Sequence, residues 1–306
     1  MITRRDFLSK SLKVSAGALL TGSAGSLFSV NPSDTITILY TNDTHARLDP
    51  FPYNARQFAG LGGITRRANV IKKIRQNQPN VLLLDAGDVF QGTPWFDVYG
   101  GEVDLELMSK MNYDAMAVGN HEFDHGLEGF SQAAKKADFP ILAANYNVAG
   151  TPLNDVVRRF ITKEIGGYKI GIFGLGIELD GVVNKKLYGD VQHRDPLIWA
   201  EGMARSLTQY QRCDFVICLS HIGYNYNDGR ICDVDLASKV EGIDLIIGGH
   251  THTFLDRPVA IKNPSGKNTY VTQMGHSGVR LGRIDLDIST GNEVKLSDRF
   301  YTIGGE

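Results

Sequence analysis

The chain has 306 residues, of which 42% are hydrophobic and 22% charged, and its formal net charge is -2. That length and apolar content suffice for a sizeable core, and the near-neutral balance argues against a protein that coats nucleic acid or binds membranes by charge. The 3 cysteines include no CxxC pair, which argues against a disulfide framework.

The first residues have the form of an export signal. Arg4 and Arg5 stand in the sequence Thr-Arg-Arg-Asp-Phe-Leu-Ser-Lys, as in twin-arginine signals, and a mildly apolar stretch rich in Gly, Ala and Ser follows. The alternatives are a short amphipathic anchor or a transmembrane helix, but the glycines and hydroxyl side chains make a poor membrane span. We expect residues 1–30 to export the protein to the periplasm or out of the cell, with no stable membrane span after processing.

Two predicted strands in the first third of the chain end in acidic or imidazole side chains. Residues 35–40 have the apolar pattern of a buried strand, and in extended backbone Asp43 and His45 would point to the same side. Residues 81–85 form a second such strand, which leads to Asp88 on a glycine-permissive turn. Open α/β sheets place their ligand sites at strand ends of this kind.

The central motif of the chain, residues 119–124, has the sequence Gly-Asn-His-Glu-Phe-Asp and follows the apolar run 115–118. Removing its four polar side chains from water together is costly unless a charged group, such as a metal ion or a phosphate, lies opposite them. Alone, the motif could equally be an ordinary turn. Its meaning depends on the other strands that end in the same way.

Two later strands repeat the pattern. Residues 215–219 lead to His221, and residues 245–247 lead to Gly-Gly-His-Thr-His, which contains His250 and His252. Five of the 8 histidines therefore follow predicted strands. A single histidine in such a place is more often structural than a ligand, whereas five together favour one shared site.

The rest of the chain supplies an alternating α/β framework. Strands are predicted at 141–144 and, as a hairpin, at 160–165 and 168–175. Helices are predicted at 64–75, 104–110, 127–136 and 196–209. The pattern of residues 259–303 is that of short strands. Because no repeat or linker interrupts this pattern, residues 31–306 are interpreted as one domain.

The strand-end side chains form a set of nitrogen and oxygen ligands without a thiolate. They are Asp43, His45, Asp88, Asn120, His121, Asp124, His221, His250 and His252. Such a set suits Zn, Mn or Fe and is too large for one ion. Two ions roughly 3.5–4 Å apart would share a carboxylate, bind a phosphate and lower the pKa of a coordinated water, which becomes the nucleophile. If the turn after Asn120 is helical, Asp124 could orient His121 toward the phosphoryl group or the leaving oxygen.

In combination these motifs resemble the calcineurin-like metallophosphoesterases. The matching blocks are Asp43-x-His45, Gly87-Asp88-x-x-Gln91-Gly92-Thr93, the motif at 119–124, His221 and Gly249-His250-x-His252. The Gln-Gly-Thr and Glu-Phe-Asp extensions, together with Gly62-Gly63, resemble the 5′-nucleotidase branch, whose periplasmic members include UDP-sugar hydrolases and cyclic-nucleotide phosphodiesterases. The resemblance extends over residues 36–286.

The resemblance implies a four-layer α/β/β/α sandwich of two mixed sheets flanked by helices. It also implies two divalent metal ions bridged by Asp88, and it matches His121 and Asp124 to the family's catalytic dyad. One ion would be held by Asp43, His45, Asp88 and His252, and the other by Asp88, Asn120, His221 and His250. Many relatives carry Gln at the position of His252, where an imidazole keeps a ligand but could alter the metal preference.

Two-domain 5′-nucleotidases continue into a C-terminal domain that binds the base and the phosphates, whereas this sequence ends at Glu306. We therefore expect an exported phosphomonoesterase that acts on nucleotides with the help of a separately encoded base-binding protein, or on a smaller substrate. The alternatives are a UDP-sugar hydrolase or a 2′,3′-cyclic-nucleotide phosphodiesterase, and after these a thiosulfohydrolase-like enzyme. A non-catalytic metal-dependent binding subunit is disfavoured because it would not need the His121/Asp124 pair.

Overall fold

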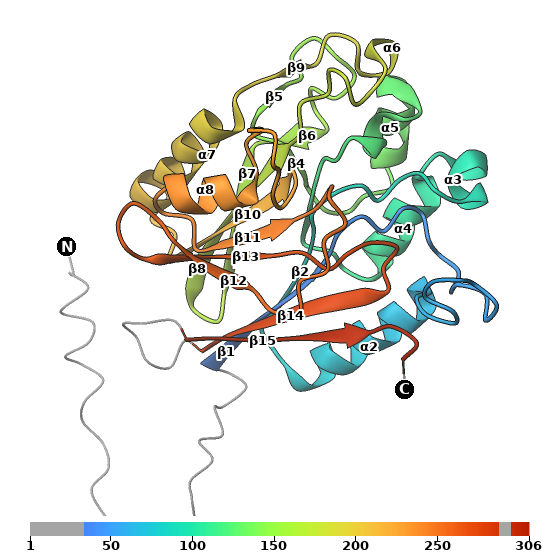
Figure 1. Ribbon diagram of the computed structural model, residues 1–306, viewed down its shortest axis with the longest axis horizontal. Coiled ribbons are helices and arrows are strands. Elements are labelled where there is room, and N and C mark those ends of the chain that lie inside the picture. The colour runs from blue at the N-terminus through green and yellow to red at the C-terminus, as the bar shows by residue number, and fades with distance from the viewer. Residues whose placement is uncertain (1–33, 288–294, 306) are drawn as a thin grey trace, which may run out of the picture.

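The computed structural model describes residues 34–287 and 295–305. The predicted signal at 1–30 and a predicted turn at 290–292 lie outside these ranges. Within them, strands and helices alternate along the chain, as the colour from blue to red shows in Figure 1. No helix in this described part of the chain combines the length and the apolar character that crossing a bilayer requires.

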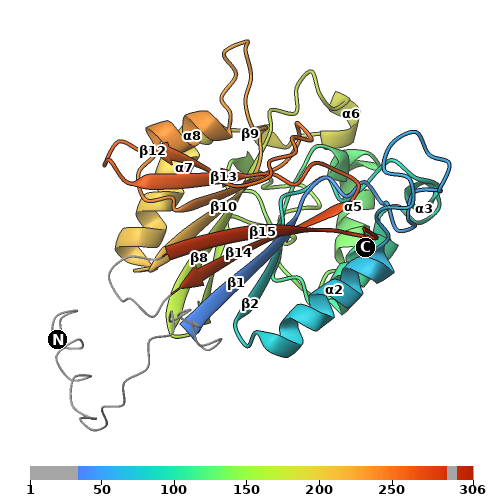
Figure 2. The same cartoon turned by 60° about the horizontal axis from the view of Figure 1, so that its bottom comes forward.

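The larger sheet has 7 strands in the order β15-β14-β1-β2-β3-β4-β6. These strands are β1 (Thr35–Thr41), β2 (Val81–Asp85), β3 (Ala115–Ala117), β4 (Ile141–Leu142), β6 (Val157–Arg158), β14 (Arg280–Asp287) and β15 (Lys295–Thr302). From β1 to β6 the neighbouring strands are parallel, whereas β14 is antiparallel to both β1 and β15. The last strands of the chain therefore lie beside its first one (Figure 2).

The second sheet has 6 strands in the order β12-β13-β11-β10-β8-β7. These strands are β7 (Phe160–Ile165), β8 (Tyr168–Gly176), β10 (Phe215–His221), β11 (Leu245–Gly248), β12 (Val259–Lys262) and β13 (Asn268–Thr272). β7 and β8 form the predicted hairpin, and β8, β10, β11 and β13 are parallel. A small third sheet pairs β5 (Tyr146–Asn147) with β9 (Gln192–His193).

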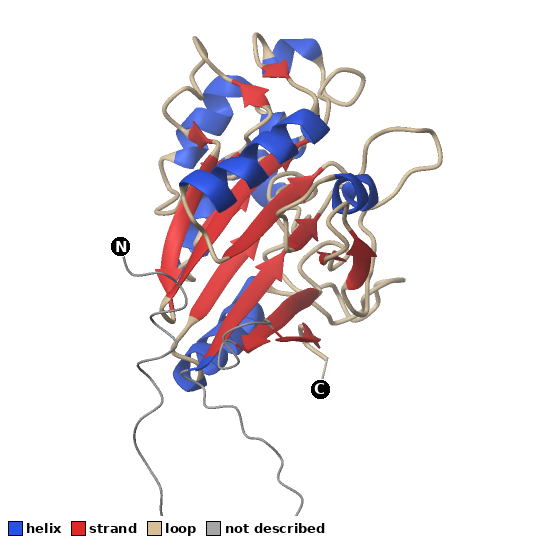
Figure 3. Cartoon of the chain, turned by 90° about the vertical axis from the view of Figure 1, so that its left-hand side faces the viewer, coloured by secondary structure: helices blue, strands red, loops and turns tan. Residues whose placement is uncertain are grey.

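Helices cover the outer face of each main sheet, and Figure 3 shows the strands in red between helices in blue. The helices are α2 (Ile64–Asn77), α3 (Pro94–Tyr99), α4 (Glu102–Lys110), α5 (Gly126–Ala134), α6 (Lys185–Tyr188), α7 (Pro196–Arg205) and α8 (Asp233–Lys239), and a π-helical turn, Ser206–Tyr210, extends α7. The apolar spacing predicted α2, α4, α5 and α7. It did not predict α3 and α8, which have only 6 and 7 residues.

Three apolar cores separate the four layers. Side chains of β1 alternate between two of them: Ile36 and Ile38 pack between the two sheets, whereas Leu39 packs toward the helices on the outer face of the larger sheet. The third core lies between the second sheet and the pair α7 and α8, and contains Phe173 and Leu207. The expected α/β/β/α sandwich is confirmed.

Candidate metal centre

The polar residues predicted to form the site lie at the carboxyl ends of strands from both sheets. Asp43 follows β1, Asp88 follows β2 and Asn120 follows β3 in the larger sheet. In the second sheet, His221 is the last residue of β10 and His250 follows β11. Because both sheets present these ends to the same edge of the sandwich, the short loops after the strands can hold their side chains around one point.

The backbone of Asp43 and His45 is not extended, so this part of the prediction is wrong. β1 ends at Thr41, and both residues have left-handed backbone, with φ of 49° and 50°. Long-range hydrogen bonds impose this turn, because the N–H groups of Asp43 and His45 donate to the carbonyl oxygens of Gly87 and Asp88. The two side chains nevertheless converge, with 4.0 Å between Asp43 Oδ1 and His45 Nε2.

Left-handed backbone is concentrated in this cluster. The members with positive φ are Asp43, His45, Asp88, His250 and His252. Such a conformation costs a non-glycine residue about 1–3 kcal/mol and persists only where the surrounding structure imposes it. Strain gathered at one set of polar side chains is typical of a functional site.

The first group of ligand atoms consists of Asp43, His45 and His252, which lie within 4.8 Å of one another. His252 Nε2 is 2.9 Å from His45 Nε2 and 3.3 Å from Asp43 Oδ1. His45 Nδ1 donates to the Phe90 carbonyl, which leaves the Nε2 lone pair of His45 directed into the group. The Asp43 side chain is buried, whereas that of His252 is 40% exposed, so the group opens to solvent on one side.

The second group consists of Asp88, His221 and His250. His221 Nδ1 donates to the Ala86 carbonyl at 2.7 Å, and His250 Nδ1 is 2.8 Å from Asn120 Oδ1. A third set, His45, Asp88 and His121, connects the two groups. The structure thus brings together all seven residues predicted as metal ligands.

The buried atoms of the second group fit a cation. His221 Nε2 is buried, lies 3.0 Å from Asp88 Oδ2 and has no aligned hydrogen-bond partner. Burial disfavours protonation of His221, yet the Asp88 carboxylate outweighs it and raises the pKa of His221 to about 10. Burial and the neighbouring charge of His221 lower the pKa of His250 to about 4, which keeps it in the neutral form that binds metals. A divalent ion held here would take the place of the proton that the Asp88 carboxylate stabilises on His221.

His121 and Asp124 form a pair at the rim of this cluster. The 3-10 turn His121–Phe123 brings His121 Nδ1 within 2.8 Å of Asp124 Oδ2, as expected for a helical turn. Burial lowers the pKa of His121, but the hydrogen bond to Asp124 and the charge of Asp88 outweigh it and raise this pKa above 6.5. The two side chains are 32% and 27% exposed, so a substrate can reach them.

Glu122 holds the two loops that carry Asp88 and Asn120 together, a role that the sequence did not reveal. Its side chain is fully buried, and its carboxylate accepts hydrogen bonds from the backbone N–H groups of Asp88, Val89, Phe90 and Gly119. These bonds join the loop after β2 to the loop after β3. The only sequence signal was an acidic residue inside an otherwise ligand-bearing motif.

Glycine is required where the same two loops touch. A Cβ atom at Gly119 would lie 2.2 Å from Asp88 Oδ1, closer than real Cβ contacts allow. At Gly87, which has φ of 93°, a Cβ atom would lie 2.8 Å from the Gly119 nitrogen. The glycines before Asp88 and Asn120 therefore let the two ligand loops approach each other.

We expect Glu122→Gln to lower both the melting temperature and the metal affinity. The amide turns a donor toward the backbone N–H groups, and leaving buried donors unpaired costs about 1–3 kcal/mol. Thermal unfolding and metal content after dialysis measure the two effects. Glu128→Gln, at an exposed position of α5, is the matched control. A Glu122→Gln protein with unchanged melting and metal content would contradict this role.

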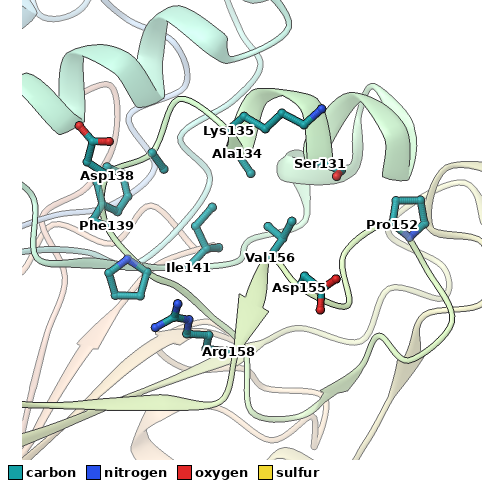
Figure 4. Close-up of a pocket in the computed structure, with 12 residues that line it drawn as sticks. Ser131, Ala134, Lys135, Asp138, Phe139, Ile141, Pro152, Asp155, Val156 and Arg158 are labelled. Atoms are coloured by element: carbon teal, nitrogen blue, oxygen red, sulfur yellow. The ribbon is translucent and has the colours of Figure 1, made fainter.

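Cavities also lie beside and away from the ligand cluster. One of about 700 Å³ is lined by the end of α5, the start of β4 and β6, including Lys135, Asp138 and Arg158 (Figure 4). It adjoins the amino end of β4, opposite to the strand ends that carry the ligands, and is therefore separate from them. A second, of about 490 Å³, is lined by Gln91 and Asp124 and borders the His121/Asp124 pair.

Comparisons with known proteins agree with this geometry. The sequence model of the calcineurin-like phosphoesterase family matches residues 36–254. The chain is 36% identical over 284 residues to a snake venom 5′-nucleotidase of Gloydius brevicauda, covering 86% of this chain and 47% of that protein. It is 33% identical over 280 residues to a 5′-nucleotidase of Homo sapiens, covering 85% and 44%. The crystal structure of a 5′-nucleotidase precursor of Thermus thermophilus has a TM-score of 0.79 at 30% identity, covering 88% and 54%.

The sandwich fold and its His/Asp groups define a metal-dependent phosphoesterase. The chain belongs to the calcineurin-like phosphoesterase family and is related to the 5′-nucleotidases within it. It spans about half the length of the curated relatives that it matches, at 47% and 44%. What those longer proteins act on therefore applies to this chain only as a proposal.

Proposed function

We propose that this chain is a dinuclear-metal hydrolase of phosphomonoesters, with nucleotides as the main substrate class. The observation that carries the proposal is the presence of two ligand groups, connected through His45 and Asp88. One group alone would suit a single ion, whereas two groups joined by a set that contains the Asp88 carboxylate suit a pair of ions that share it. The relatives named as 5′-nucleotidases support nucleotides as substrates.

In this proposal the predicted ligand sets are retained. Asp43, His45, Asp88 and His252 would hold one ion, and Asp88, Asn120, His221 and His250 the other. When bound, a pair of Zn, Mn or Fe ions stabilises the charge of the phosphoryl group and lowers the pKa of water, so no Ser or Cys nucleophile is needed.

The chain itself contributes orientation and proton transfer. Asp124 accepts the Nδ1 proton of His121, which fixes the ring and leaves Nε2 for the substrate. The raised pKa of His121 favours its protonated form, which can stabilise the phosphoryl oxygens or protonate the leaving oxygen. The proposal also includes export, which the twin-arginine-like sequence at Arg4 and Arg5 supports.

A substrate panel tests the proposal. Metal-loaded protein is assayed for phosphate release from AMP and phenyl phosphate, and for cleavage of UDP-glucose and 2′,3′-cyclic AMP. We expect hydrolysis of AMP and phenyl phosphate. Cleavage of UDP-glucose or 2′,3′-cyclic AMP in preference to AMP would favour the sugar hydrolase or phosphodiesterase alternatives. No hydrolysis of any of the four would contradict phosphoesterase function.

A further inference from the structure

Three loops that are distant in sequence bring aromatic rings together beside the first ligand group. The ring of His276 stacks on that of His252, with 4.8 Å between centroids and 27° between planes. The centroids of Phe58 and Phe254 lie 5.3 Å and 5.8 Å from that of His276 and 5.7 Å from each other. We name Phe58, Phe254 and His276 the aromatic ledge. The stacking of His276 on His252 connects the aromatic ledge to the first ligand group.

The aromatic ledge is accessible from solvent. Phe254 is 36% exposed and is among the large hydrophobic residues of the described chain that are not buried. Phe58 and His276 are half-buried, and the adjoining His252 side chain is 40% exposed. Phenylalanines that serve only the core, such as Phe123, are fully buried. An apolar surface that borders a polar cluster is typical of a ligand site.

The backbone conformation of the three loops fixes the positions of these rings. Phe58 has φ of 56°, a left-handed conformation that is costly for an aromatic residue. Gly275 lies directly against Phe254, because a Cβ atom there would fall 2.1 Å from the Phe254 ring. The Ser277 N–H donates to the Asp43 carbonyl at 2.7 Å, which ties the loop of His276 to the first ligand group.

We propose that the aromatic ledge binds a planar aromatic leaving group of a phosphoester whose phosphate lies at the metal centre. This inference rests on the proposed function. A leaving group that extends from the phosphate past the exposed His252 meets the ring surface of His276, Phe58 and Phe254. Aromatic groups gain ring–ring contacts there that an aliphatic group cannot make. The site therefore favours phosphoesters whose leaving group carries an aromatic ring, such as aryl phosphates and nucleotides, over purely aliphatic ones.

Stacking can be measured without turnover by using phosphonates, which have no ester bond to cleave. The affinities of phenylphosphonate and methylphosphonate for metal-loaded protein are compared by calorimetry. We expect phenylphosphonate to bind the wild-type chain about tenfold more tightly, within the range that stacking on an aromatic side chain contributes. In Phe254→Leu, which keeps an apolar side chain but loses the ring, we expect this preference to fall to about twofold or less.

Phe58→Leu provides a second variant and is expected to reduce the preference in the same direction. Tyr210→Leu removes an exposed ring, 77% accessible, on the turn that extends α7, and should leave the preference unchanged. Equal binding of both phosphonates by the wild-type chain, or a preference that survives both phenylalanine variants, would refute binding of aromatic groups at the aromatic ledge. Either result would leave the proposed function standing. If neither phosphonate bound at all, the proposed function itself would fail, and this inference with it.

Discussion

Asp88→Asn is expected to lose metal from both ligand groups and most of its phosphoesterase activity. Asp88 belongs to the second group and to the set that connects it with the first. The asparagine side chain has nearly the same volume and could still accept the His121 N–H, which now donates to Asp88 Oδ1 at 2.8 Å. The loop would therefore keep its shape, while the charge shared by two cations would disappear.

The loss should exceed the roughly 10–100-fold that removal of an outer-shell partner costs in metal affinity or activity. Elemental analysis after dialysis and turnover of phenyl phosphate measure the two effects. Asp97→Asn, at an exposed position of α3, is the matched control and should behave like the wild-type chain. An Asp88→Asn protein that retained two ions and near-normal turnover would exclude a bridging role.

His121→Ala is expected to separate chemistry from metal binding. The contact of His121 with Asp88 is made by its backbone N–H, which alanine keeps, so both ions should remain bound. The imidazole next to Asp124 would be missing, and the loss of a general acid or charge-stabilising group typically lowers kcat about 10²–10⁴-fold.

The measurements are kcat on phenyl phosphate and the number of ions per chain. His125→Ala replaces a neighbouring, exposed histidine and serves as the control. If His121→Ala lost metal in proportion to activity, His121 would be a ligand rather than a group that acts on the substrate.

The framework and the location of the site were readable from the sequence because strong local patterns specify both. The apolar runs of β1, β2 and β10 are long enough to identify buried strands, and each ends next to a polar group of the cluster. The parallel pairing that gathers these ends follows from the alternation of strands and helices. Short helices such as α3 and α8 contain too few apolar residues to display the helical spacing that identifies a longer helix.

The features that the sequence did not reveal depend on contacts between distant segments. The left-handed backbone at Asp43 is imposed by a hydrogen bond to the carbonyl of Gly87, which belongs to another strand's loop. Glu122 organises the loop of Asp88, which lies 34 positions earlier. The aromatic ledge draws Phe58, Phe254 and His276 from three separate loops. No local pattern records such pairings.

The central claim is that two metal ions share Asp88 and together support phosphoester hydrolysis. Metal-free wild-type chain titrated with Mn or Zn tests it most directly, with ions per chain and phenyl phosphate turnover followed at each addition. We expect two ions to bind per chain and turnover to reach its maximum only when the second is bound. Full activity with a single ion per chain, or activity that persists after complete metal removal, would contradict the account.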